Sequence, residues 1–307
     1  MDWNSEYITD LIARALTEDV GTGDATVAAT IPANAAGQAH IVAKQELVCA
    51  GLPLAEQVFR TLDPDIDVEF PARDGQWVRQ AQDVLHLSGT AAAILTGERT
   101  ALNFLGRLSG IATLTRRFAE QLAGTRAKIR DTRKTTPGLR LLEKYAVKMG
   151  GGTNHRIGLY DGILLKENHI ALAGGVKAAL DQAHSYLSSQ MKPRAMTAYE
   201  AVGSEPIPGE GDSLPIQIEV RNEAELREAL AAGAESVLLD NMSTDQARQC
   251  VAVVREVRPA CMVEISGGIT LENVRAYAET GADFLSSGAL THSAPNADFS
   301  LLVDSIE

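Results

Sequence analysis

The sequence predicts an α/β protein in which an N-terminal α+β domain precedes a parallel β/α barrel. In the second half of the chain, short apolar runs typical of buried strands alternate with helical stretches, as in barrels. Residues up to about 90 mix strand-like and helical runs without that regular alternation. Between these parts, leucines over 91–122 recur at helical spacing. We expect this connecting stretch to form one long helix, or two that meet near 106–110.

The first domain is assigned to residues 1–115. It opens with a helix whose apolar positions include Ile8 and Leu16 and whose N-cap is Asn4 or Ser5, and glycines after residue 20 end it. The next expected elements are strand-like runs at 38–43, 68–70, 77–78 and 84–87 and a helical stretch near 54–60.

The barrel domain is assigned to residues 116–292. Its expected strands are 128–131, 162–166, 216–220, 236–240, 262–266 and 284–287. Its expected helices are 223–232, one from a capping box at Ser243 and Gln246 to about 257, and 271–279 with Thr270 as cap. Six such strands favour a barrel over an open sheet. A Pro-, Gly- and Ser-rich stretch near 186–214 is interpreted as a surface insertion, and residues 293–307 as a segment that packs on the first domain.

Composition excludes several classes of protein. A formal net charge of −12 over 307 residues argues against a non-specific nucleic-acid binder, because phosphates need a positive surface. No apolar run approaches the roughly 18 residues of a membrane helix, and the N-terminus lacks the pattern of a signal peptide. Cys49, Cys250 and Cys261 are odd in number and far apart, so we expect no disulfide framework and a cytoplasmic location.

Positive charge is nevertheless concentrated in one place. Residues 126–166 hold ten of the 28 basic residues and only three of the 40 acidic ones. The same window contains three consecutive glycines at 150–152, followed by Asn154 and His155. A cationic window in an acidic chain indicates an anionic ligand, although an ordinary basic surface patch is the simpler alternative.

Polar residues gather where the expected strands end. Active sites of β/α barrels lie at the carboxyl ends of the strands. The candidates at these ends are Arg133, Lys134, Lys166, Glu219, Asp240, Ser266, Gly267, Gly268, Ser287, Gly288 and His292.

The residue types suggest separate tasks. The two glycine turns, the first expected to lead into a helix, are typical of phosphate sites. Arg133, Lys134, Arg156 and Lys166 suit carboxylates or a pyrophosphate. Glu219 and Asp240 suit either ligation of Mg²⁺ together with substrate phosphates or stabilisation of an oxocarbenium-like centre. The pattern indicates a phosphorylated sugar, a carboxylated second substrate and transfer at an anomeric carbon.

The motifs of the chain resemble those of the quinolinate phosphoribosyltransferase family, also called nicotinate-nucleotide pyrophosphorylase (carboxylating). The most specific are DTRKTTPGLR at 131–140 and GGGTNHR at 150–156. Others are EDVGTGDAT within 16–26, ERTALN at 98–103, RLSGIAT at 107–113, EKYAV at 143–147, LKENHI at 165–170, DNM at 240–242, EISGG at 264–268 and SGALTHS at 287–293.

The resemblance implies an N-terminal open α+β sandwich, an incomplete barrel and a homodimer with a shared active site. It implies the reaction of quinolinate with 5-phosphoribosyl 1-pyrophosphate, with Mg²⁺ as cofactor. Arg99 would then reach quinolinate from the partner subunit. Thr132, Arg133, Lys134, His155, Arg156 and Lys166 would line the quinolinate and pyrophosphate pocket. Glu219 and Asp240 would face the ribose and metal, and Ser266, Gly267, Gly268, Ser287, Gly288 and His292 would hold the 5-phosphate. Lys134, Glu219 and Asp240 are the expected catalytic residues.

The chain departs from the family pattern at two positions and in one length. Gln217 and Glu167 stand where the family often has Glu and Asp, and the stretch at 186–214 is longer than expected. Three alternatives stay open at this point: a relative with a different acceptor, an aldolase-like enzyme with a Schiff-base lysine, and a non-catalytic anion-binding barrel.

Overall fold

A computed structural model describes residues 1–189 and 214–306, which divide into two compact units. One unit comprises Met1–Arg116, Lys148–Gly151 and Ala294–Glu307, and the other Arg117–Val147 and Gly152–Ser293. Most of the expected insertion at 186–214 lies outside the described residues. Its first positions, up to Ser189, belong instead to a helix.

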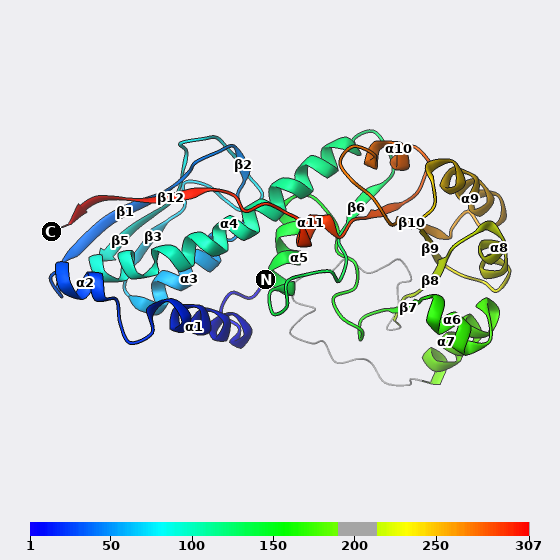
Figure 1. Ribbon diagram of the computed structural model, residues 1–307, viewed down its shortest axis with the longest axis horizontal. Helices are drawn as coiled ribbons and strands as arrows, with labels where there is room; N and C mark the ends of the chain where they lie inside the picture. Colours follow the sequence, from blue (N-terminus) through cyan, green and yellow to red (C-terminus); the bar gives the residue numbers. More distant parts are fainter. Residues whose placement is uncertain (190–213, 307) are drawn as a thin grey trace. The chain divides into compact units, whose positions relative to one another are not determined.

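The first unit is an α+β fold built on an antiparallel sheet of four strands in the order β12-β1-β5-β3 (Figure 1). These strands are β1 (Ala36–Ala43), β3 (Asp67–Glu69), β5 (Asp83–Thr90) and β12 (Phe299–Ile306). A separate pair joins β2 (Leu47–Val48) to β4 (Trp77–Val78). The helices are α1 (Glu6–Val20), α2 (Ala25–Thr30), α3 (Leu52–Leu62) and α4 (Ala91–Gln121). The expected strands and helices of this part therefore exist, with bounds shifted by a few residues.

Helix α4 is a single helix, which settles the choice that the sequence left open. The glycines that suggested a break serve packing instead. A Cβ at Gly106 would lie 2.8 Å from the carbonyl oxygen of Ala297, and one at Gly110 would overlap that of Pro295. The missing side chains thus let the segment that leads into β12 lie directly on the helix.

Strand β12 was not predicted, because its pairing partner is distant in sequence. It runs antiparallel to β1, with Phe299 opposite Ala43 and Ile306 opposite Gly37. In Figure 1 the red C-terminal strand lies beside the blue β1. The C-terminal residues are therefore a structural part of the first unit.

The second unit contains six parallel strands in the order β6-β11-β10-β9-β8-β7. They are β6 (Lys128–Arg130), β7 (Ile163–Leu165), β8 (Ile216–Val220), β9 (Ser236–Asp240), β10 (Met262–Ser266) and β11 (Phe284–Ser286). All six were predicted to within one or two residues. Because β6 and β7 stand at opposite ends of this order, the sheet of the described residues is an incomplete barrel.

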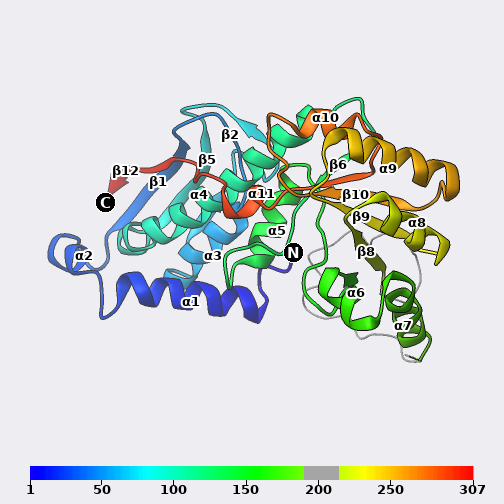
Figure 2. The same cartoon turned by 45° about the vertical axis from the view of Figure 1, so that its right-hand side comes forward.

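The helices of this unit follow the strands and flank them, as Figure 2 shows for α8 and α9. They are α5 (Arg140–Met149), which runs into the first unit, α6 (Glu167–Ala173), α7 (Val176–Ser189), α8 (Glu223–Ala231), α9 (Thr244–Val257), α10 (Val274–Ala278) and α11 (Ala289–His292). The capping box of Ser243 and Gln246 is confirmed at the start of α9. The helix expected from residue 271 is shorter, because Asn273 bonds back to Thr270 and Gly268 and holds the preceding residues in turns.

A buried ion pair joins the end of β6 to α5. Lys144 Nζ lies 2.6 Å from Asp131 Oδ1 and 2.9 Å from the carbonyl oxygen of His155, and neither side chain of the pair is exposed. Asp131 also accepts the backbone N–H of His155 at 2.8 Å. Burial raises the pKa of Asp131 and lowers that of Lys144, while their mutual attraction opposes both changes. The pair therefore anchors the segment that carries His155.

Lys144→Met is expected to lower the free energy of unfolding by about 3–5 kcal/mol, because it leaves the Asp131 carboxylate buried without its partner. The double variant Asp131→Asn with Lys144→Met should be more stable than Lys144→Met alone, since it no longer buries an unpaired charge. Urea denaturation of the wild type, both single variants and the double variant measures this. A double variant less stable than either single one would show that the hydrogen bonds, rather than charge balance, dominate.

Candidate active site

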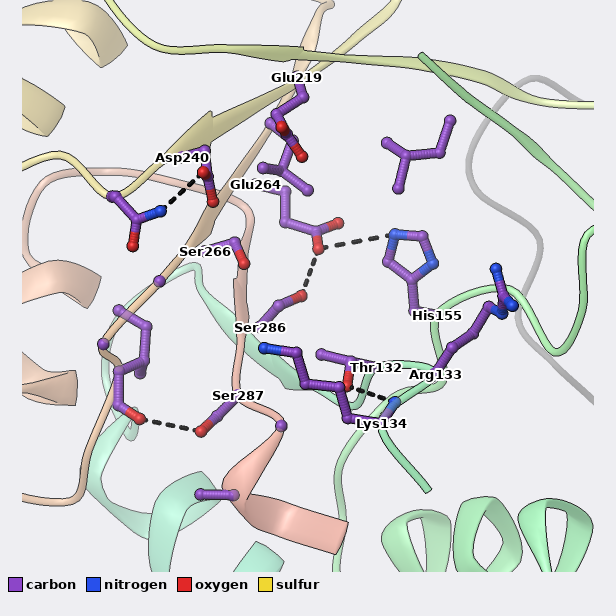
Figure 3. Close-up of a pocket in the computed structure, with 18 of the residues that line it drawn as sticks. Thr132, Arg133, Lys134, His155, Glu219, Asp240, Glu264, Ser266, Ser286 and Ser287 are labelled. Atoms are coloured by element: carbon purple, nitrogen blue, oxygen red, sulfur yellow. Dashed lines mark hydrogen bonds and ion pairs between the residues drawn. The ribbon is translucent and has the colours of Figure 1, made fainter. Parts of the chain in front are cut away.

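The strands of the second unit present two layers of polar side chains at alternate positions. The deeper layer contains Arg130, Gln217, Glu264 and Ser286, all buried. Two residues further along β8 and β10 come Glu219 and Ser266, at the carboxyl ends where Asp240 also lies, and Thr132 and Gly288 follow just after β6 and β11 end. Because side chains of a strand alternate between faces, Glu219 points to the same side of the sheet as Gln217, and Ser266 to the same side as Glu264. Figure 3 shows Glu264 and Ser286 of the deeper layer together with Thr132, Glu219, Asp240 and Ser266.

A cavity of about 610 Å³ opens over these strand ends. It is lined by Thr132, Arg133, Lys134, His155, Arg156, Lys166, Glu219, Asp240, Ser266, Gly267, Gly268, Ser287, Gly288 and His292, among others. The structure therefore brings together every site residue named from the sequence except Arg99. Arg99 belongs to α4 of the first unit, where its side chain is 64% exposed and lies 3.9 Å from Glu98.

Four cations line the cavity: Arg133, Lys134, Arg156 and Lys166. Burial and the nearby charge of Arg133 lower the pKa of Arg156. One guanidinium N–H of Arg156 donates to the carbonyl of Gly162 at 2.7 Å, which fixes the side chain in place. Two like charges held close together in a partly buried wall favour binding of an anion between them.

Four of the other six cations in the window, Arg126, Arg130, Arg140 and Lys144, are held by contacts within the protein, so the net positive charge of the window overstates the anion site. Arg130 pairs with Glu264 at 3.0 Å, and Arg126 with Asp283 at 2.6 Å. Arg140 donates to Thr135 and to the carbonyl of Ile157. Lys144 is the buried partner of Asp131, and Lys148 belongs to the first unit.

Glu219 and Asp240 lie on neighbouring strands at the rim of the cavity. Burial raises the pKa of Glu219, the charge of Asp240 raises it further, and Lys166, 3.6 Å away, opposes both effects. Among the described residues, no group of three or more His, Cys, Asp or Glu side chains is arranged to hold a metal ion. Two carboxylates fit a Mg²⁺ ion that takes its other ligands from substrate and water.

The two glycine turns differ from each other. Gly267 and Gly268 both have positive φ, 98° and 64°, and a Cβ at Gly267 would overlap the side chain of Asn241. The expectation that a helix follows this turn directly is wrong, because α10 begins only at Val274. At Gly288 a Cβ would lie 2.9 Å from Lys134 Cδ and 3.0 Å from the ring of His292. Because Gly288 has no side chain, Lys134 and His292 can both approach the backbone of the second turn.

The sequence analysis missed the residues of the deeper layer as part of the site. Gln217 and Glu264 each stand two positions before a predicted site residue, Glu219 and Ser266, and line the same face. The period of two along a strand was the available signal. It was not used because buried polar residues at these positions resemble ordinary strand interiors in a single sequence.

The fold and the cavity define the class: a β/α-barrel protein with a pocket at its strand ends that is lined by cations, glycine turns and two carboxylates. Models of the quinolinate phosphoribosyl transferase N-terminal and C-terminal domains match residues 24–109 and residues 111–201 with 208–302. The chain belongs to the quinolinate phosphoribosyl transferase family.

The sequence similarity to known proteins extends over nearly the whole chain. A probable nicotinate-nucleotide pyrophosphorylase (carboxylating) of Bacillus subtilis is 40% identical, covering 97% of this chain and 94% of that protein. The chloroplastic nicotinate-nucleotide pyrophosphorylase (carboxylating) of Arabidopsis thaliana is 38% identical, covering 96% and 82%. The structure of NadC from Streptococcus pyogenes superposes with a TM-score of 0.86 at 36% identity, covering 100% of this chain and 99% of that one. The fold class predicted from the sequence is thereby confirmed.

Gly267→Ala is expected to disrupt the first glycine turn, because the new methyl group is forced against Asn241. Gly233→Ala is the matched control: Gly233 also has a positive φ, 90°, but it lies outside the cavity, and the nearest atom to its Cβ position is 3.8 Å away. The control should lose only the roughly 1–2 kcal/mol of a left-handed alanine and keep its affinity for ribose 5-phosphate. Urea denaturation and isothermal titration calorimetry measure the two effects. Equal losses of affinity in both variants would refute a specific role of the Gly267 contact.

Proposed function

We propose that this enzyme transfers the phosphoribosyl group of 5-phosphoribosyl 1-pyrophosphate to quinolinate, with release of pyrophosphate and CO2 and formation of nicotinate mononucleotide. The reaction belongs to NAD biosynthesis. The observation that carries the proposal is the cavity itself, where four cations, two glycine turns and two carboxylates meet at the strand ends of one unit. Family membership supplies the identity of the substrates.

Different cations of the cavity suit different anionic groups of the two substrates. Arg133, Arg156 and Lys166 suit the carboxylates of quinolinate, since guanidinium groups bind carboxylates through two hydrogen bonds. Lys134 lies against Gly288 and thus beside the second glycine turn, which suits a phosphate or pyrophosphate oxygen. The backbone of the two turns receives the 5-phosphate, where glycines permit close approach.

Glu219 and Asp240 face the carbon at which transfer occurs. As pyrophosphate leaves, positive charge develops on the ribose, and nearby carboxylates stabilise it more than they stabilise the neutral sugar. The same two side chains would hold Mg²⁺ together with substrate oxygens, and the ion would neutralise the departing pyrophosphate. Both roles require ionised carboxylates.

Loss of CO2 needs no nucleophile from the protein. Once ribosylated, the ring nitrogen is cationic, so the electron pair left by the departing carboxylate is stabilised on the ring. The protein orients the carboxylate and supplies the positive environment.

Among the described residues, no lysine suits an aldolase-like mechanism. Lys144 is the strongly desolvated one, but its Nζ is occupied by Asp131 and by the carbonyl oxygen of His155 and does not line the cavity. The cavity lysines, Lys134 and Lys166, stand among other cations. The lysine environment therefore favours anion binding over Schiff-base chemistry.

The proposal includes a cytoplasmic location and a homodimeric assembly. Among the described residues, no helix is both long enough and apolar enough to cross a membrane. Three buried free cysteines suit the reducing cytoplasm. A homodimer in which Arg99 of each subunit serves the site of the other accounts for an arginine of the family motif that lies outside the cavity.

Release of pyrophosphate that depends on quinolinate is the direct assay. Formation of nicotinate mononucleotide and CO2 in equal amounts supports the proposal. Covalent trapping of a substrate by borohydride would indicate the aldolase alternative instead. Binding of quinolinate without turnover would indicate a binding protein, and turnover with another pyridine or pyrimidine acid would indicate a different acceptor.

The rate of the chemical step should fall as acid protonates Glu219. Because burial raises the pKa of this group in the free enzyme, the acidic limb of the kcat/KM–pH profile should lie at higher pH than an ordinary glutamate would give. Lys166→Met removes an opposing charge and should move the limb to higher pH. Glu219→Gln and Asp240→Asn should lower kcat about 100-fold, with smaller changes in quinolinate affinity. Glu223→Gln, an exposed carboxylate on α8, is the control, and an unchanged kcat in Glu219→Gln would remove that residue from the mechanism.

Subunits that carry Arg99→Ala and Lys134→Ala should each be nearly inactive and should complement each other when mixed. In a random 1:1 mixture half of the dimers are hybrids with one intact site of two, so roughly a quarter of wild-type activity should return. Subunit exchange is verified by native mass spectrometry with one isotope-labelled variant. Proven exchange without recovered activity would place Arg99 in the site of its own subunit or outside it.

A further inference from the structure

A buried carboxylate, Glu264, lies at the centre of the deeper polar layer. Its side chain is 1% exposed and accepts hydrogen bonds from Arg130 Nη1 at 3.0 Å, from Gln217 Nε2 at 3.0 Å and from the hydroxyl of Ser286. Burial acts to raise the pKa of Glu264, whereas the charge of Arg130 and the hydrogen bonds from Ser286 and Gln217 act to lower it. The group is therefore an ionised acceptor of hydrogen bonds only.

This carboxylate dictates the orientation of the Gln217 amide. Since Glu264 cannot donate, the amide nitrogen must face it, and the same nitrogen reaches Ser236 Oγ at 3.3 Å. The reversed amide would place its carbonyl oxygen against a negative charge. The carbonyl oxygen of Gln217 is consequently turned towards His155 and lies 3.0 Å from its Nε2.

The two contacts of the imidazole then determine where its proton sits. Nε2 faces a carbonyl oxygen and must carry a hydrogen, whereas Nδ1 accepts the backbone N–H of Arg156 at 2.7 Å. A proton on Nδ1 would bring two donors together at that distance. Glu264, with its Oε1 3.7 Å from Nε2, would attract a charged ring. Burial lowers the pKa of His155, and Arg130 and Lys144 lower it further against this attraction.

We propose that Gln217 is a positioning residue: it holds His155 as the neutral Nε2–H tautomer, and this tautomer seats the backbone of Arg156 in the cavity wall. His155 then contributes no positive charge and no free nitrogen to the substrate. Within this unit the anion-binding charge then comes mainly from Arg133, Lys134, Arg156 and Lys166. Glu264, Gln217 and His155 form a relay from the centre of the sheet to a residue that contacts the substrate. Only the kinetic consequence rests on the proposed function.

Nuclear magnetic resonance of protein labelled with ¹⁵N-histidine tests the tautomer directly. The chain has six histidines, and single Gln substitutions of His40, His86, His169, His184 and His292 identify five, leaving His155 by elimination. A protonated Nε2 and an unprotonated Nδ1 are expected throughout the range of about pH 6–8 in which ordinary histidines titrate. An imidazolium ion or the Nδ1–H tautomer at neutral pH would overturn the proposal. This readout does not depend on any enzymatic activity.

Substitutions of Gln217 test the cause. Gln217→Glu places a second carboxylate against Glu264, so His155 should gain a proton at neutral pH and show the imidazolium signal. Gln217→Met keeps the size but removes the acceptor, so both neutral tautomers should become populated. Ser236→Ala is the matched control, because it removes the other partner of the amide and leaves the His155 contact intact. A wild-type His155 signal in Gln217→Met would show that Gln217 does not set the tautomer.

The kinetic arm tests the positioning role. In Gln217→Met the KM for quinolinate should rise about tenfold or more through the displaced Arg156, with a smaller change in kcat, while Ser236→Ala stays near wild type. An unchanged KM together with an altered tautomer would refute the relay to Arg156. Absence of quinolinate turnover in the wild-type protein would instead refute the proposed function and leave the tautomer result standing.

Discussion

The site depends on one physical constraint: an ionised carboxylate, Glu264, is buried in the sheet beneath the cavity and must be fully compensated. A buried charge is tolerated only when it is paired and hydrogen-bonded. Arg130 supplies the opposite charge and lies 3.4 Å over the ring of Phe284, while Ser286 and Gln217 satisfy the remaining acceptor sites. Four strands are thereby tied together on the side of the sheet that faces the cavity.

The charged side chains of this unit have different partners in the interior and at the rim of the cavity. In the interior the cations pair with carboxylates, as Arg130 does with Glu264 and Lys144 does with Asp131. At the rim the cations outnumber the two carboxylates, so positive charge remains for a ligand. The same stretch of sequence therefore stabilises the fold at one level and binds anions at the next. The departure from the family at Gln217 falls in the deeper layer, where an uncharged amide leaves the balance between Arg130 and Glu264 undisturbed.

The sequence motifs of the family are divided between the two units. The motifs at 131–140, 264–268 and 287–293 meet in the cavity, while Arg99 lies in a separate unit and does not line it. In the proposed homodimer, Arg99 would come to this site from the partner subunit. Glycines serve two purposes: Gly106 and Gly110 permit a chain segment to lie on α4, whereas Gly267 and Gly288 leave room at the site.

The sequence by itself determined the fold class, the six strands of the barrel and most of the polar residues that gather at the carboxyl ends of those strands, but not the buried Glu264 and Ser286. It could do so because strand period, cap residues and polar strand ends are local patterns. Tertiary structure alone decided that α4 is continuous, that β12 joins β1, and which cations are free for a ligand. It also decided the state of His155, because the proton position depends on Glu264, more than a hundred residues away in sequence, acting through Gln217. Such choices are made by partners distant in the chain, and no local pattern encodes them.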